Sequence, residues 1–141
     1  MIKATIDLNV IIDFLNKRAF HTEAAEILQL SLYKKIRSYV CAHEITALSY
    51  SLSKQFQNRF KTKNIIKELL DFISVIEINK SILLESLNSK ITDFEDAIIE
   101  ASSKLYKIKY IITGNIPDFK KSTVQTITPL EFLALYHKNQ L

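Results

Sequence analysis

The sequence has very few residues that break regular structure, since its 141 residues include one glycine and two prolines. This scarcity argues against long irregular loops and favours a helix-rich fold. Cysteine is equally scarce: Cys41 stands alone, so a domain held together by internal disulfides is excluded and a reducing compartment is expected. We expect Cys41 to pack in the core rather than to act as a nucleophile.

Long apolar runs are also absent. No stretch approaches the ~20 apolar residues that a membrane-spanning helix needs. Lys3 and Asp7 interrupt the apolar residues at the N-terminus, so we expect no signal peptide, no membrane contact and a cytoplasmic protein. The length suits a single domain over residues 1–141. The net charge of +4 permits nucleic-acid binding without identifying it.

Strand-like and helix-like segments alternate along the chain. The expected strands cover residues 2–7, 37–41, 74–78, 109–113 and 124–127, the last as an edge strand. The expected helices cover residues 8–16, 21–35, 44–53, 58–72, 80–89, 92–106 and 129–136. This alternation predicts an α/β fold of three layers, with helices on both faces of a central, mainly parallel sheet of four or five strands. In such sheets ligands bind at the carboxyl ends of the strands.

The segment over residues 92–106 has the clearest helix signals. Thr92 and Glu95 match a capping box at its start. Its expected buried stripe consists of Phe94, Ala97, Ile98, Ala101 and Leu105. Gly114, just beyond the strand expected over 109–113, is predicted to supply a positive φ or a close backbone approach.

Acidic residues follow the expected strands. Asp7 closes the first strand, Glu44 follows the second, and Asp118 follows the fourth. Asp93 and Asp96 lie in the first turn and a half of the helix expected over 92–106. Because the carboxyl ends of parallel strands meet at one edge of a sheet, these carboxylates are expected to gather there.

A gathering of carboxylates needs a cation or protons to be stable. Two carboxylates about 4 Å apart repel by roughly 4 kcal/mol at an effective dielectric of about 20. Oxygen ligands suit Mg²⁺ or Mn²⁺, whereas Zn²⁺ prefers His and Cys, which have no paired spacing here. A cation held by carboxylates in a mildly basic protein indicates phosphodiester hydrolysis.

Each acid also has a purely structural interpretation. Asp7 could cap the helix that follows it. Glu44 and Asp93 could be first-turn acids favoured by the helix dipole, and Asp96 could lie on a solvated face. Asp118 could serve a turn.

Basic residues fall into three groups, and none is singled out as the track for RNA. The groups are Lys34, Lys35 and Arg37; Lys54, Arg59, Lys61, Lys63 and Lys67; and Lys104, Lys107, Lys109, Lys120 and Lys121. The second group has Phe56 and Phe60 interleaved. Aromatic side chains can stack single-stranded bases, but this spacing more often anchors a helix to the core.

Taken together, these segments resemble the PIN domain family, and in particular the toxin ribonucleases of bacterial VapBC-type toxin–antitoxin systems. The resemblance spans nearly the whole chain and rests on the order and spacing of its segments. These are DLNVIID at 7–13, Glu44, DFEDA at 93–97, ITGNIPDF at 112–119 and TPLEFL at 128–133.

The resemblance implies roles for individual residues. The implied Mg²⁺ or Mn²⁺ ligands and catalytic acids are Asp7, Glu44, Asp96 and, less regularly, Asp118. The residues implied to shape the site are Asn9, Thr113 and Asn115, with Asp93 as a further candidate. Two positions depart from the family pattern. Gly114 stands where many relatives have Arg, which removes a cation that could touch RNA phosphate, and Leu8 replaces the more usual Thr.

We therefore expect a metal-dependent endoribonuclease that acts on RNA, forms a homodimer and binds a small antitoxin protein. One alternative is a catalytically weak PIN-fold module that binds RNA or protein, which Gly114 leaves open. Another is a Mg²⁺-dependent phosphohydrolase or receiver-like phosphoacceptor. Those proteins typically carry a second acid two residues after the first aspartate, where this chain has Asn9.

Overall fold

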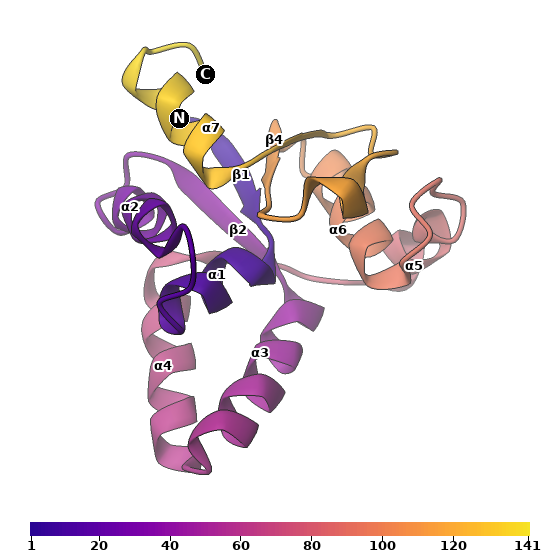
Figure 1. Ribbon diagram of the computed structural model, residues 1–141. Coiled ribbons are helices and arrows are strands. Elements are labelled where there is room, and N and C mark those ends of the chain that lie inside the picture. The colour runs from indigo at the N-terminus through magenta and orange to yellow at the C-terminus, as the bar shows by residue number, and fades with distance from the viewer.

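A five-stranded sheet, parallel throughout, lies at the centre of the protein (Figure 1). The computed structural model describes all residues, 1–141. The strands in spatial order are β3 (Ser74–Ile76), β2 (Arg37–Cys41), β1 (Lys3–Ile6), β4 (Tyr110–Ile112) and β5 (Gln125–Ile127). β1 is therefore central and β5 is an edge strand, as predicted. The predicted parallel α/β fold is confirmed.

Helices connect the strands, as parallel pairing requires. They are α1 (Leu8–Leu15), α2 (His21–Leu32), α3 (Ala42–Phe56), α4 (Arg59–Phe72), α5 (Lys80–Ser86), α6 (Phe94–Leu105) and α7 (Pro129–His137). A short 3-10 helix, η1 (Ile116–Phe119), follows β4. None of these helices is both long and apolar enough to span a bilayer.

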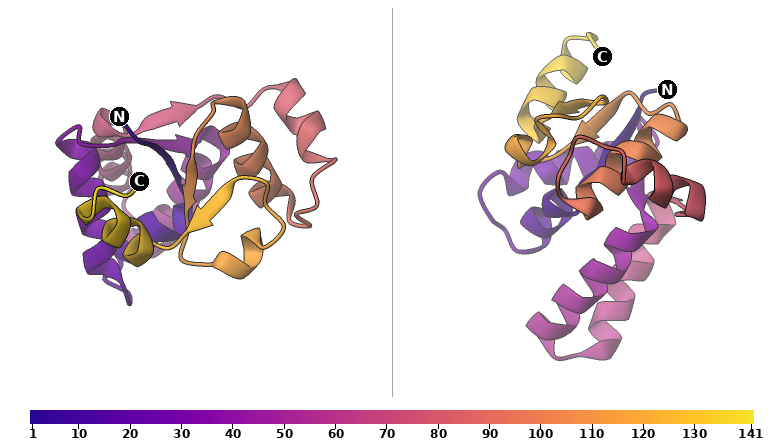
Figure 2. Two further views of the ribbon diagram at one scale, coloured as in Figure 1. Left: turned by 90° about the horizontal axis from the view of Figure 1, so that it is seen from above. Right: turned by 90° about the vertical axis from the view of Figure 1, so that its right-hand side faces the viewer.

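Apolar side chains project from both faces of the sheet, which explains why helices cover both. On one face, Ile6 and Ile112 join a core built with α1, α2, α3, α4 and α7. On the other face, Cys41 and Ile111 pack against α6 and η1. Cys41 is a buried free thiol, as expected. These two cores give the predicted three layers (Figure 2).

The α3–α4 hairpin extends well beyond the sheet (Figures 1 and 2). Asn58 begins α4 by accepting a hydrogen bond from the Lys61 backbone N–H at 3.1 Å. Phe56, next to this turn, is partly buried in the core, and the Lys61 ammonium lies 4.0 Å from the centre of its ring. Phe56 is therefore an anchor of the hairpin, as expected for this spacing, whereas Phe60 is 75% exposed and the same expectation is wrong for it.

The start of α6 differs from its predicted form. Asp93, not Thr92, is the N-cap, and its carboxylate accepts a hydrogen bond from the Asp96 backbone N–H at 3.0 Å. The predicted capping box of Thr92 with Glu95 is therefore wrong. Phe94 and Leu105 are 45% and 56% exposed, so the buried stripe of α6 lacks both of its predicted ends.

The prediction for Gly114 is also wrong. Its φ is not positive. A Cβ atom at this position would meet nothing nearer than Asp13 Oδ2 at 3.6 Å, which is an ordinary contact. Neither backbone strain nor close packing therefore requires a glycine here.

Candidate functional site

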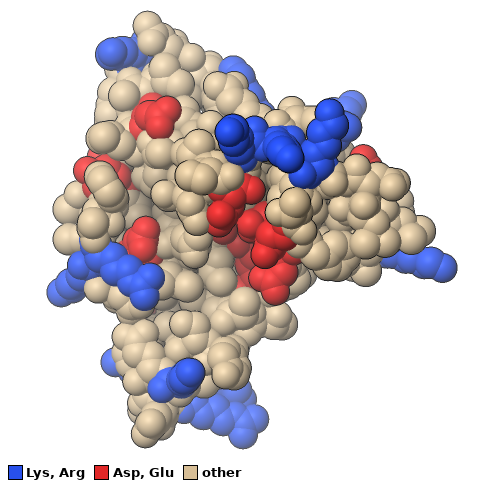
Figure 3. Space-filling view, turned by 45° about the vertical axis from the view of Figure 1, so that its right-hand side comes forward, with Lys and Arg blue, Asp and Glu red and all other residues tan.

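The acidic residues meet at the edge of the sheet where β1, β2 and β4 end. Ile6 pairs with Ile112, so Asp7 and Thr113 leave the sheet side by side. The Asp7 backbone N–H continues the ladder by donating to the Ile112 carbonyl at 2.9 Å. α3 and α6 both begin at this edge, and the acidic side chains gather in one hollow of the surface (Figure 3).

Thr113 orients the Asp7 carboxylate. Its hydroxyl donates to Asp7 Oδ2 at 2.7 Å, and the Asn9 amide lies 3.4 Å from the same oxygen. Although Asp7 occupies the N-cap position of α1, it makes no side-chain capping hydrogen bond to that helix. The capping interpretation of Asp7 therefore does not account for its buried side chain.

The network continues from Thr113 to Asp118. The Asn115 backbone N–H donates to Thr113 Oγ1 at 3.0 Å, and the Asn115 side-chain amide donates to Asp118 Oδ2 at 2.5 Å. Asp118 itself is exposed on η1. Thr113 and Asn115, which follow β4, thus connect the buried carboxylate of Asp7 on the neighbouring strand with the exposed carboxylate of Asp118.

Glu44 lies beside Asp7 with its side chain buried. Its carboxylate accepts hydrogen bonds from the Leu8 backbone N–H at 2.7 Å and, more weakly, from Cys41 N–H at 3.4 Å. Glu44 therefore also holds the first turn of α1 against α3. Burial, together with the neighbouring Asp7 charge, raises the pKa of Glu44 well above its usual value. Burial likewise raises the pKa of Asp7.

Asp96 faces the same group of acids from α6. Burial, together with the nearby charges of Asp93, Asp7 and Asp118, raises its pKa to about 7. Asp93 is exposed and caps the helix, so its structural role is established by the hydrogen bond to Asp96 N–H.

The donor set fits Mg²⁺ or Mn²⁺ in chemistry but does not form a finished cage. No three Asp, Glu, His or Cys side chains come close enough together to hold a metal ion by themselves. Mg²⁺ commonly keeps several waters and binds through one or two carboxylates, so a complete protein cage is not required. The raised pKa values of Asp7, Glu44 and Asp96 show that negative charge is disfavoured here, and a bound cation would relieve that.

Metal affinity is expected to depend on pH near neutrality. A metal bound by Asp96 would displace its proton, and because the pKa of Asp96 is about 7, the protonated fraction grows as the pH falls below that value. Displacing one proton weakens affinity by up to about tenfold per pH unit. We expect Mn²⁺ titration calorimetry to show this loss between about pH 7 and pH 6. Affinity that stays constant across this range would contradict it.

A histidine at this edge escaped the sequence interpretation. His43 Nε2 lies 3.2 Å from the Glu95 carbonyl, so it donates there and joins the starts of α3 and α6. Burial lowers the pKa of His43, which keeps the ring neutral. Only its position next to Glu44 in the sequence could have indicated it. Asp13, on α1, lies over Gly114 and forms a loose ion pair with Arg18 at 3.9 Å.

Glu100 is a buried carboxylate that lies apart from the acidic hollow, one turn further along α6. It accepts hydrogen bonds from the Ser89 hydroxyl at 2.6 Å and from the Thr123 backbone N–H at 2.7 Å. It therefore connects the loop before α6 with the loop after η1.

Replacing Glu100 with alanine is expected to lower the free energy of unfolding by roughly 2–4 kcal/mol, because each hydrogen bond to a charged group contributes about 1.5–3 kcal/mol and the donors lose their partner. Chemical denaturation measures this change. The exposed Glu85 on α5 is the control, and its replacement by alanine should change stability by less than about 0.5 kcal/mol. Equal effects of the two substitutions would show that Glu100 does not hold the loops.

Comparisons with known proteins agree with this architecture. The profile of the PIN domain matches residues 3–117. Among curated proteins, none matches the chain. This chain is similar to the structure of VapBC2 from Rickettsia felis bound to a promoter DNA fragment, with a TM-score of 0.72 and 16% sequence identity. That similarity covers 90% of this chain and 98% of the other.

Two further solved structures share the fold. VapBC-1 from nontypeable Haemophilus influenzae has a TM-score of 0.68 and 18% identity, over 92% of this chain and 99% of that one. A toxin–antitoxin complex from Klebsiella pneumoniae has a TM-score of 0.66 and 22% identity, over 89% and 97% of the two chains. At such identities the likeness is one of fold, and the profile match over most of the sequence shows that the chain belongs to the PIN domain family.

Proposed function

We propose that this chain is a metal-dependent endoribonuclease that hydrolyses phosphodiester bonds of RNA. The observation that carries the proposal is the placement of Asp7, Glu44 and Asp96 together at the carboxyl edge of the sheet, with raised pKa values. Burying carboxylates beside one another lowers stability unless they are compensated. Such clusters are typical of functional sites.

Asp7, Glu44, Asp96 and Asp118 would hold the Mg²⁺ or Mn²⁺. When bound, the cation would lower the pKa of a water and stabilise charge on the phosphate oxygens. Thr113 holds the Asp7 carboxylate in one orientation and Asn115 does the same for Asp118, so both acids are preorganised. The buried Cys41 does not compete as a nucleophile, because burial raises the pKa of its thiol and keeps it protonated.

The proposal is tested by Mn²⁺ titration calorimetry together with cleavage of a labelled single-stranded RNA. We expect Mn²⁺ to bind and cleavage to require the metal, with loss of activity in EDTA. Metal binding without cleavage of any RNA supplied would favour the alternative of a weakly active binding module. Absence of both would overturn the proposal.

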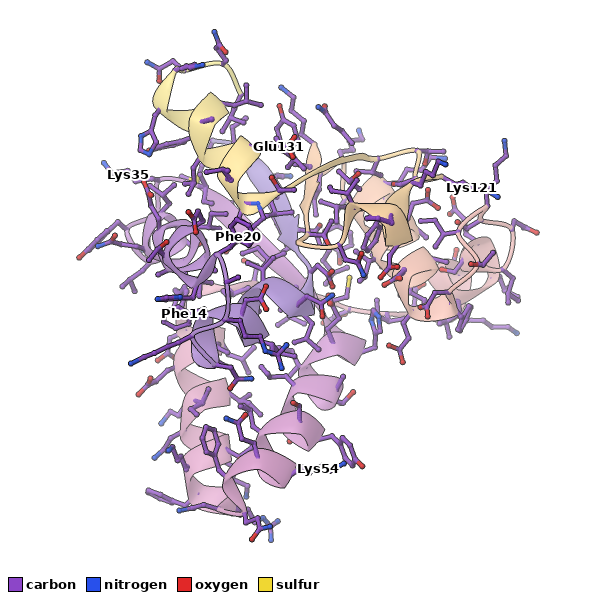
Figure 4. All side chains as sticks on the ribbon, in the orientation of Figure 1. Phe14, Phe20, Lys35, Lys54, Lys121 and Glu131 are labelled. Atoms are coloured by element: carbon purple, nitrogen blue, oxygen red, sulfur yellow. The ribbon has the colours of Figure 1, made fainter.

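A small antitoxin protein is the partner that we propose for this ribonuclease. Similar structures include toxin–antitoxin complexes, and this chain has an apolar cleft of about 460 Å³ between α1, α2 and α4. Phe14 and Leu32 line this cleft and are 37% and 53% exposed. Figure 4 labels Phe14 on this side of the molecule. Co-expression with the product of a neighbouring reading frame should give a complex that co-purifies and inhibits cleavage. The expected homodimer stays a prediction, which the molar mass in solution tests.

The receiver-like alternative is not favoured by the geometry. Such a protein requires a second carboxylate two residues after the first, and this position holds Asn9, which directs its amide toward Asp7. The Asn9 amide can donate a hydrogen bond to the Asp7 carboxylate, but it is neutral and cannot supply the negative charge of a second acidic metal ligand.

A further inference from the structure

The acidic hollow by itself repels the polyanion that it is proposed to cleave. RNA carries one negative charge per nucleotide, and proteins bind it largely through lysine and arginine contacts to phosphate. A ribonuclease with this hollow therefore needs positive charge beside it. The tertiary structure decides which of the basic groups along the sequence can supply this charge.

The group of Lys34, Lys35 and Arg37 lies at the wrong edge of the sheet. Arg37 begins β2 and pairs with Lys3 at the beginning of β1, whereas the acids lie where these strands end. The five residues of β2 separate the two edges by about 16 Å. Figure 4 places Lys35 at the outer end of α2, far from the hollow.

The second group lies on the α3–α4 hairpin. Lys54 is near the end of α3, where the hairpin extends away from the sheet (Figure 4). Lys61 is already engaged with the ring of Phe56 at 4.0 Å. This group can meet only a distant part of a long RNA.

The third group divides into two parts. Lys104 lies in the last turn of α6, while Asp96 lies in the first turn of this 12-residue helix, which is about 18 Å long. Lys107 and Lys109 both lie before β4, at the edge opposite the acids, and the Lys109 ammonium lies 5.2 Å from the centre of the Tyr110 ring. Only Lys120 and Lys121 remain on the side of the acids, since they follow η1 and Asp118.

Lys90 joins Lys120 and Lys121 from a different part of the chain. The three lysines line one surface depression of about 150 Å³, and Asp118 lines it too. All three are exposed, and neither ion pair of the protein involves them. Figure 3 shows a group of basic side chains bordering the acidic hollow, and Figure 4 places Lys121 on this side of the molecule. We call these three residues the lysine rim.

The loops that carry the lysine rim are held in place. Ser89, next to Lys90, donates to Glu100, and Thr123, two residues after Lys121, donates to the same carboxylate. Ile91 and Phe119 anchor these loops in the core. A buried acid thus fixes two separate loops so that their lysines face one depression, which reduces the entropy lost when an anion binds.

We propose that the lysine rim of Lys90, Lys120 and Lys121 binds an RNA backbone phosphate next to the scissile bond, on the Asp118 side of the acidic hollow. The inference rests on the proposed ribonuclease function. It adds that the RNA strand passes over the Asp118 side of the acidic hollow. The lysine rim also supplies a positive charge that position 114 lacks, because Gly114 has no side chain.

The test compares two triple variants with the same change of net charge. In one, Lys90, Lys120 and Lys121 become alanine; in the other, the exposed Lys54, Lys63 and Lys67 of the hairpin do. Binding of labelled single-stranded RNA is measured with Ca²⁺ in place of Mg²⁺ over a range of salt concentrations. We expect the rim variant to bind at least about tenfold more weakly and to lose about 0.7 from its salt slope, since each neutralised phosphate contributes about 0.7. The hairpin variant should stay within about twofold of wild type.

Calorimetry with Mn²⁺ separates the possible failures. The rim variant should bind Mn²⁺ as wild type does, because its acids are intact. Wild-type cleavage combined with equal RNA affinity of both triple variants would overturn the lysine rim while leaving the ribonuclease function in place. Wild-type protein that neither binds nor cleaves RNA would overturn both. Loss of a protein complex in the rim variant, with RNA affinity unchanged, would assign these lysines to a protein partner and overturn the proposal.

Discussion

Replacing Asp7 or Asp96 with asparagine is expected to reduce metal-dependent RNA cleavage by roughly 100-fold or more. A catalytic cation contributes several kcal/mol to the transition state, and each 1.4 kcal/mol corresponds to about tenfold in rate. Asparagine keeps the size of the side chain but removes the charge that attracts the metal. Mn²⁺ calorimetry should show a matching loss of affinity in both variants.

The exposed Asp71 on α4 provides the control for these substitutions. Its change to asparagine removes the same charge away from the hollow and should leave cleavage and Mn²⁺ affinity near their wild-type values. Circular dichroism checks that all three variants stay folded. Full activity in both the Asp7 and Asp96 variants would contradict the site assignment, whatever the metal dependence of the wild type.

The same Asp7→Asn substitution is expected to make the metal-free protein more stable at neutral pH. Asp7 is buried beside Glu44, and folding raises its pKa. The asparagine side chain can still accept the hydrogen bond from the Thr113 hydroxyl, and its amide can donate to the Glu44 carboxylate. It therefore keeps the contacts and removes the buried charge.

The pH dependence follows from the direction of this shift. A carboxyl group whose pKa is raised by folding holds its proton more tightly in the folded state, so the folded state loses relative stability as the pH rises through the raised pKa. The variant should therefore exceed wild type in Tm at about pH 7 in EDTA, and the difference should vanish near pH 4. A gain of 1 kcal/mol corresponds to about 3–5 °C in a domain of this size.

Metal ions should reverse this order. Mn²⁺ binds the folded wild type and raises its Tm by mass action, whereas the Asp7 variant gains little. Lower stability of the Asp7 variant in EDTA would mean that the carboxylate serves the fold. In that case the loss of activity would follow from the loss of stability and would not support a metal-binding role for Asp7.

The sequence by itself determined the fold class and predicted which acids gather at one edge of the sheet. Alternating strand and helix patterns arise from local periodicity, and continuous apolar strands such as 110–112 are typical of burial on both faces. Parallel strands then require their carboxyl ends to meet, so Asp7 and Asp118 could be placed at one edge without coordinates. The family resemblance rested on the same order of acids, and the profile match over residues 3–117 agrees with it.

Features that depend on exact helix phase or backbone angles were predicted less well. Thr92 and Asp93 are both good N-caps, and a shift of one residue moved the start of α6 and removed the predicted capping box. Phe94 and Leu105 lie at the ends of α6, where the covering layer stops, so apolar character did not ensure burial. Gly114 shows that a rare residue type does not always mark a special φ.

Only the tertiary structure decided what each charged group contacts. Glu100 looked like one more acid on a helix face, yet it joins two loops that lie 34 residues apart, at Ser89 and Thr123. The sequence did not distinguish among the three groups of basic residues. The structure places one group at the opposite edge of the sheet from the acids and another on the α3–α4 hairpin. Long-range contacts have no local periodicity, because they depend on how whole elements pack, and that packing brought Lys90 beside Lys120 and Lys121 next to the acidic hollow.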